Sequence, residues 1–234
     1  MTLTEIHVGV TSTPYDDLAD TPGGEVHEED AERMTPTITV PSGNPPILDG
    51  SHSLGEWDGA TVESFADGSQ LFLMANGEFL YVGIRAKEPG TIAANVFIQS
   101  GDEITIMHSS AALGTAVYKR SDDTWQQVKD FTWRCRNTGN SEAAQAERTG
   151  FLHEEGWLAA NGLMGTPNEM EYMIEIPEQD FRLAAVYIQA TPPYEKTAWP
   201  VGLDDVCFEP TPGGGLPSTI VFMPEMWVRI QVED

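Results

Sequence analysis

The stretch SQLFLMANGEFLYVGIRA, residues 69–86, decides the fold class of this chain. Two apolar runs flank Asn76-Gly77, and this dipeptide is the strongest short-range signal for a β-hairpin. Similar runs, separated by turn residues, continue to the end of the chain at 94–108, 114–136, 169–177, 181–190 and 218–232. Roughly eight to eleven short strands joined by tight turns predict an all-β fold consisting of a single β-sandwich.

One segment interrupts the β pattern. Residues 140–162, NSEAAQAERTGFLHEEGWLAANG, show no alternation of apolar and polar residues, and Asn140 or Ser141 could cap a helix that stops at Gly162. The apolar side chains of this segment can share one helical face. We therefore expect a helical insertion of one or two short helices at about 140–162, packed over the sheet.

The N-terminal region differs in composition from the rest of the chain. Residues 1–36 are rich in acids and turn formers and have almost no apolar periodicity, so we expect a largely irregular, acidic arm. The sequence TITV at 37–40 is typical of a strand. The predicted β-sandwich domain therefore covers residues 37–234.

Charge and composition limit the possible partners. The chain has 37 acidic and 12 basic residues, a formal net charge of −25, and so negative a surface repels the phosphates of nucleic acids. No apolar run is long enough for a membrane-spanning helix, and Met1 to Ala19 lack the features of a signal peptide. Cys135 and Cys207 could form one disulfide in an exported protein, or remain two buried thiols.

The start of the predicted sandwich carries a family resemblance. Residues 47–60 read ILDGSHSLGEWDGA, which resembles the opening motif of the family nine carbohydrate-binding modules and the related DOMON domains. The resemblance implies a jelly-roll or immunoglobulin-like sandwich that binds sugars or, in other branches, a b-type haem. In this motif Asp49-Gly50 would form a turn and Trp57 would pack into the sandwich.

The resemblance leaves the ligand and the compartment open. No pair of tryptophans matches the pair that clamps sugars in the binding modules, so the ligand is not inherited with the fold. Members of the family usually belong to larger extracellular or periplasmic proteins, whereas the sequence as given shows no signal peptide and fits a cytoplasmic location.

Three tryptophans are candidates for sugar binding, because the apolar face of a pyranose packs on an aromatic ring. Trp125 follows a predicted turn, Trp157 lies in the predicted helical segment, and Trp199 lies in the loop PPYEKTAWPVG. Core or interface packing is the favoured alternative for each of them.

His108 shares one face of a predicted strand with Ile104 and Ile106, and small residues follow it as far as Ala116. It could line a pocket in which a flat ligand lies against these small residues. We favour a buried histidine that is satisfied by a backbone or hydroxyl partner, because buried polar groups are usually hydrogen-bonded. The small residues would then admit the predicted 140–162 helix.

Basic residues gather near the end of the predicted 124–136 strand. Arg134 and Arg136 lie on one face of it, opposite Phe131 and Trp133, and could grip a carboxylate bidentately. Internal ion pairs are the favoured alternative, because the chain has so many acids of its own.

Cofactor sites have weaker signals. Asp49, Glu56 and Asp58 offer the oxygen ligands that calcium prefers, without the spacing of an EF-hand. A b-type haem would need two axial ligands, such as His108 with a methionine, and the adjacent Met107 lies on the opposite strand face.

No motif of a known catalytic class occurs in the sequence. We therefore predict a non-catalytic ligand-binding module, in the first place for carbohydrate. Two alternatives stay open. One is a structural or accessory subunit that contacts a protein partner through its arm and helix, and the other is a b-type haem electron-transfer domain.

Overall fold

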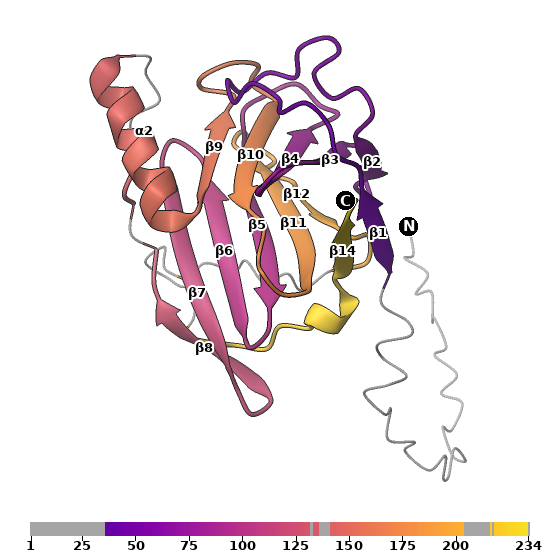
Figure 1. Ribbon diagram of the computed structural model, residues 1–234, viewed down its shortest axis with the longest axis vertical. Coiled ribbons are helices and arrows are strands. Elements are labelled where there is room, and N and C mark those ends of the chain that lie inside the picture. Colours follow the sequence, from indigo (N-terminus) through magenta and orange to yellow (C-terminus); the bar gives the residue numbers. More distant parts are fainter. Residues whose placement is uncertain (1–35, 132, 136–140, 204–215, 217, 234) are drawn as a thin grey trace, which may run out of the picture.

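The computed structural model describes residues 36–131, 133–135, 141–203, 216 and 218–233. Within these residues the chain forms a sandwich of two β-sheets with one α-helix at its flank (Figure 1), which confirms the predicted fold class. The predicted arm lies outside the described residues except for Pro36, and so do Arg136 and Cys207. Among the described helices, none has the length and apolar character needed to cross a membrane.

The larger sheet has nine strands in the order β1-β14-β11-β5-β6-β7-β8-β13, and β12 pairs with β11 beside this path. Its pairs are antiparallel except for β1 with β14, which run parallel. The bounds are β1 (Thr37–Val40), β5 (Ile92–Ser100), β6 (Glu103–Ser109), β7 (Leu113–Ser121), β8 (Thr124–Lys129), β11 (Phe181–Gln189), β12 (Lys196–Trp199), β13 (Thr219–Ile220) and β14 (Val228–Val232).

The smaller sheet has five antiparallel strands in the order β2-β3-β4-β10-β9. Their bounds are β2 (Thr61–Ser64), β3 (Gln70–Asn76), β4 (Phe79–Arg85), β9 (Trp157–Asn161) and β10 (Glu169–Glu175). The predicted hairpin is formed by β3 and β4, and its two-residue turn lies one position later in the chain than Asn76-Gly77. Asn76 pairs with Phe79, so the two loop residues are Gly77 and Glu78. Gly77 has a φ of 59°, which suits a glycine in a tight hairpin turn.

The helical insertion is shorter than predicted. Helix α2 (Glu142–Glu155) begins after Ser141, whose hydroxyl accepts a hydrogen bond of 3.2 Å from the backbone N–H of Ala144. It ends at Gly156, which adopts a left-handed conformation with φ 70°. The rest of the predicted helical segment forms β9 instead, because its apolar residues complete the edge of the smaller sheet next to β10.

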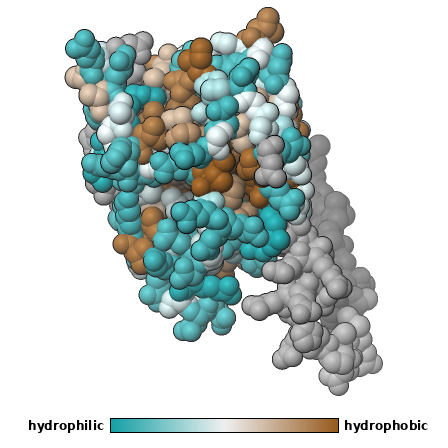
Figure 2. Space-filling model, in the orientation of Figure 1, coloured by the Kyte–Doolittle hydropathy of each residue, from teal (hydrophilic) through white to brown (hydrophobic). Residues whose placement is uncertain are grey.

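Both faces of the larger sheet bury apolar side chains. One face packs against the smaller sheet and forms the main core, which includes Val96, Met107 and Leu183. Apolar side chains on the opposite face, which we call the outer face, are covered by the C-terminal segment around Phe222 and Trp227. Figure 2 shows one side of the molecule, where hydrophobic residues gather in the centre and upper part of the view among hydrophilic ones.

Candidate ligand-binding site

The three tryptophans predicted as sugar platforms are buried. The exposed fractions are 5% for Trp125, 1% for Trp157 and 2% for Trp199. Trp157 and Trp199 belong to the main core, and Trp125 packs on the outer face. The expectation of exposed rings at these positions is wrong, because the apolar area of an indole is better buried where the sheets supply a partner surface.

Trp133 is the tryptophan that reaches the surface, with 39% of its area exposed. The predicted strand does not extend to it, because β8 ends at Lys129 and the chain then turns back toward β7. Leu113 of β7 and Cys135 form an isolated bridge that holds this returning segment in place. The ring of Trp133 stacks on that of Phe131 at 5.7 Å between centroids, with the planes 10° apart. These two rings form what we call the aromatic platform.

The aromatic platform explains why small residues follow His108. A Cβ atom at Gly114 would lie 3.1 Å from Cε3 of Trp133 and 3.3 Å from Cδ1 of Phe131, so the two rings rest on the glycine. His108 is paired with Gly114 across the strands, and its ring meets Trp133 edge-on at 5.1 Å between centroids. The space above Gly114 is therefore occupied by the platform, and not by the helix that we expected there.

His108 lies on the outer face with Ile104 and Ile106, and Met107 lies in the main core, as the alternation predicted. Its Nδ1 is 2.6 Å from Oδ1 of Asn95, so the ring has a hydrogen-bond partner as expected, but the partner is a side-chain amide and not a backbone or hydroxyl group. Burial lowers the pKa of His108 to about 4, so the ring is neutral at physiological pH. With Nδ1 donating to Asn95, the neutral ring keeps Nε2 as an acceptor beneath the platform.

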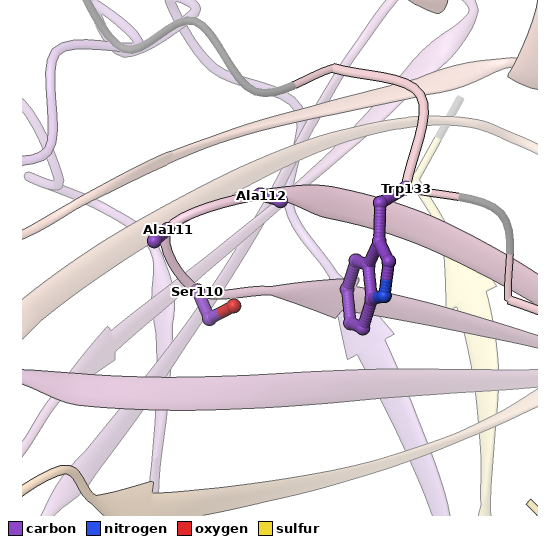
Figure 3. Close-up of a pocket in the computed structure, with 4 residues that line it drawn as sticks. All are labelled: Ser110, Ala111, Ala112 and Trp133. Carbon is purple, nitrogen blue, oxygen red and sulfur yellow. The ribbon is translucent and has the colours of Figure 1, made fainter. Parts of the chain in front are cut away.

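A hollow of about 290 Å³ opens beside the platform. Its lining consists of Ser110, Ala111, Ala112 and Trp133 (Figure 3). In the figure the Trp133 ring and the Ser110 hydroxyl project from neighbouring stretches of chain into the same space. The hollow thus combines an aromatic face, small side chains that allow close approach and a hydroxyl group, which suits a flat ligand with both apolar and polar parts.

Arg134 does not form a free positive patch. Its guanidinium contacts Glu154 and Glu155 of α2, and Lys129 pairs with the same Glu155 at 2.5 Å. These contacts confirm the predicted alternative of internal ion pairs and tie the platform segment to the helix. Of the two arginines predicted to grip a carboxylate, Arg134 is thus engaged within the chain.

Two of the three carboxylates predicted to hold calcium, Glu56 and Asp49, accept hydrogen bonds from the turns of the 47–60 segment. Glu56 accepts hydrogen bonds from the backbone N–H groups of Ile47 and Ser53, at 2.6 and 2.9 Å. Asp49 accepts one from Ser51 at 2.9 Å. Across the described part of the chain, no three histidine, cysteine or acidic side chains form a group suited to a metal ion. Calcium binding by Asp49, Glu56 and Asp58 stays a prediction.

The 47–60 segment is anchored to β10 by a buried acid that sequence reasoning missed. Oε2 of Glu171 accepts hydrogen bonds from the backbone N–H groups of Asp49 and Gly50, at 3.0 and 2.9 Å, and the side chain is fully buried. Burial raises the pKa of Glu171 to about 8, although these two bonds favour the charged form. Gly50 has φ 84°, which confirms the predicted turn.

Trp57 packs in a different place from the one predicted. It joins Phe72 and Tyr81 on the face of the smaller sheet that points away from the main core. His52 completes this cluster, with ring centroids 5.2 Å from Trp57 and 5.1 Å from Phe72. Gly83 makes the contact possible, because a Cβ there would lie 2.9 Å from atoms of both His52 and Trp57.

Comparisons with known proteins give distant likenesses. No family model matches the chain, and neither does any curated protein. One similar solved structure is a family nine carbohydrate-binding module from Caldicellulosiruptor kristjanssonii in complex with cellotriose, with 12% identity, TM-score 0.43, and coverage of 84% of this chain and 93% of that one. Another is a candidate carbohydrate-binding protein from Bacteroides uniformis, with 10% identity, TM-score 0.46, and coverage of 85% and 100%. Likenesses this distant do not assign the chain to a family.

Proposed function

We propose that the chain is a non-catalytic module that binds carbohydrate through the aromatic platform. The observation that carries the proposal is the exposed ring of Trp133, which is stacked on Phe131 and borders the hollow at Ser110–Ala112. The ring of Trp133 stacks on Phe131 and rests on Gly114 of β7, so it is held in one orientation before any ligand binds. Binding to a rigid surface of this kind loses little conformational entropy.

The chemistry of the hollow fits a sugar better than a purely apolar ligand. The C–H groups on one face of a pyranose can pack on the Trp133 ring, while its hydroxyl groups need donors and acceptors at the edge. Ser110 offers a hydroxyl in the hollow, and its main-chain carbonyl accepts from the side-chain amide of Asn161, which fixes this turn. A neutral sugar also avoids the repulsion that a chain of net charge −25 exerts on anions.

Calorimetric titration of the wild-type chain with neutral trisaccharides of different linkage, such as cellotriose, xylotriose and maltotriose, tests the proposal. We expect saturable binding of at least one of them. Trp133→Ala should weaken that binding about tenfold or more, because it removes the stacking face. Met226→Ala is the matched control, since it also removes an exposed apolar side chain, on the short Pro224–Met226 helix. This variant should bind as the wild type does.

Two results would reject the proposal. One is the absence of saturable binding to any neutral saccharide. The other is equal affinity in wild type and Trp133→Ala, which would place a sugar somewhere other than the platform. Circular dichroism melts of both variants show whether each is folded before it is titrated.

A further inference from the structure

A cavity of about 310 Å³ lies between the inner faces of the two sheets, at the end of the sandwich where α2 stops. Ile98 and Met107 line it from the larger sheet. Trp157 and Ile174 line it from the smaller sheet. All four residues belong to the main core. The two sheets therefore do not close over the core at this end, and apolar side chains form the floor of the cavity.

A second cavity of about 370 Å³ adjoins the first one and has a different character. The two cavities share Ile98, Thr105, Pro177 and Glu178 in their linings. The second cavity continues to the turn between β5 and β6, where its lining is polar and includes Asp102 and Glu103. We call the two cavities together the trough. The trough has an apolar inner half and an acidic outer half.

The charge of the trough is not balanced by its own lining. Among the described residues that line either cavity, none is basic. Glu103 pairs with Lys119, and Glu155 pairs with two basic side chains. Asp102, Glu175 and Glu178 are exposed and form no ion pair with any residue that the structure describes. Their negative charge attracts a cationic partner.

We propose that the trough binds an extended segment of a protein partner in which an apolar side chain is flanked by lysine or arginine. The apolar side chain would fill the inner half and cover Ile98, Met107 and Ile174, as the central anchor of an interface does. The flanking cations would lie beside the exposed carboxylates of Glu175 and Glu178. Because the two halves share part of their lining, the apolar and charged groups of the ligand must be close neighbours, as they are in one short peptide segment.

Charge also decides which occupants do not suit the trough. The N-terminal arm of the chain, residues 1–36, is rich in acids and would be repelled by the outer half. A second copy of the chain carries a formal net charge of −25 and would be repelled in the same way. A basic segment of a different protein is therefore the partner that fits.

Calorimetric titration of the full chain with the peptide Lys-Lys-Leu-Lys-Lys, blocked at both ends, tests the proposal. We expect saturable binding. Lys-Lys-Ser-Lys-Lys lacks the apolar anchor and Glu-Glu-Leu-Glu-Glu reverses the charge, so each should bind about tenfold more weakly or worse. Hexylammonium chloride offers an apolar tail with one free amine. It should also bind at least about tenfold more weakly, because it makes a single charged contact.

Variants of the chain locate the binding site. The double variant Glu175→Gln/Glu178→Gln should weaken binding of the leucine peptide about fivefold or more, because it removes two carboxylates from the trough. Glu88→Gln/Glu195→Gln removes the same charge from exposed loops near the start of β5, at the opposite end of that strand. This control should change the affinity by no more than about twofold, since distant exposed charges are screened. Thr105→Phe should abolish binding, because position 105 lines both cavities and the ring would fill them.

Four results would overturn the proposal. The first is the absence of saturable binding of the leucine peptide to the wild-type chain. The second is equal affinity for the serine peptide, or for hexylammonium, which would remove the need for an anchored segment. The third is an equal loss in the two double variants, which would reduce the effect to net charge. The fourth is unchanged affinity in Thr105→Phe, once circular dichroism shows that this variant is folded.

Discussion

The indole Nε1 of Trp157 donates a hydrogen bond of 2.8 Å to Oγ1 of Thr115, and this bond joins the two sheets inside the main core. Trp157 lies on β9 of the smaller sheet, and Thr115 lies on β7 of the larger one. Both residues are buried, so neither group has water as a substitute partner. The contact fixes β9 against β7 at the flank where α2 and the aromatic platform meet.

Thr115→Val should therefore lower the free energy of unfolding by about 1–3 kcal/mol, because it leaves the indole N–H buried without an acceptor. Chemical denaturation monitored by circular dichroism measures the change. Thr105→Val makes the same chemical change at a half-buried position of the neighbouring strand β6, where it breaks no inter-sheet bond to a tryptophan among the described residues, and should cost less. Equal costs for the two variants would show that the inter-sheet bond is not important for stability.

Gly83→Ala should destabilise the packing of the 47–60 segment on the smaller sheet. The new methyl group would lie 2.9 Å from Cε1 of His52 and Cζ2 of Trp57, which is closer than packed atoms allow. We expect a loss of about 1–3 kcal/mol from overpacking, measured by urea unfolding. Gly150→Ala in α2 is the control, because a Cβ there meets no atom and alanine favours a helix. That variant should be as stable as the wild type or slightly more stable.

Glu171 should make stability depend on pH in a defined direction. Its pKa is raised from 4.5 to about 8 in the folded chain, because burial penalises the charged form. The folded chain therefore binds a proton between these values that the unfolded chain has lost. The stabilising contribution is complete below about pH 4.5 and is lost as the pH rises through about 8, with a slope of at most about 1.4 kcal/mol per pH unit.

Comparison with Glu171→Gln isolates this contribution from that of the other acids. Glutamine does not titrate and keeps an acceptor for the N–H groups of Asp49 and Gly50. The stability of the wild type relative to this variant should fall between pH 5 and pH 8 in urea denaturation series. Glu63→Gln, at a half-buried position of β2, removes a carboxylate elsewhere on the smaller sheet and is the control. A constant difference for Glu171→Gln would contradict the prediction.

Gly114→Ala should act on the aromatic platform rather than on the fold. The added Cβ would displace the rings of Trp133 and Phe131 by a few tenths of an ångström from the position in which Gly114 holds them, while the strands beneath keep their pairing. We expect a stability loss below about 1 kcal/mol, together with weaker binding of any saccharide that the wild type binds. A thermal melt and a titration decide between the outcomes. A large loss of stability with unchanged affinity would mean that the platform is a structural element of the outer face.

The features predicted correctly from sequence depend on local signals. Asn76-Gly77 marks the β3-β4 hairpin, and Ser141 caps α2, because turn and cap chemistry involves neighbouring residues. Core packing of Trp125, Trp157 and Trp199 was the favoured alternative, but the surfaces that cover them could not be predicted in this way, since these come from distant parts of the chain.

The sequence contains a signal for the surface position of Trp133 that our strand prediction did not take into account. Lys129 and Asp130 are residue types depleted in strands, and they stand where β8 ends. Oδ1 of Asp130 accepts a hydrogen bond of 2.7 Å from the backbone N–H of Phe131, as an aspartate in a turn does. Reading a turn there would have moved Trp133 out of the sheet and onto the surface. Glu171 gave no such signal, because its burial depends on the 47–60 segment folding over β10.

The parallel pairing of β1 with β14 has a consequence for how the chain matures during translation. Ser42 donates a hydrogen bond to the main-chain carbonyl of Glu233 across a separation of 191 residues, just beyond the four paired positions of the two strands. Until β14 has left the ribosome, β1 has no partner and the start of β11 exposes an unpaired edge. Such an edge is a template for aggregation. The larger sheet therefore stays open on this side until β14 is synthesised, and β14 closes it by inserting between β1 and β11.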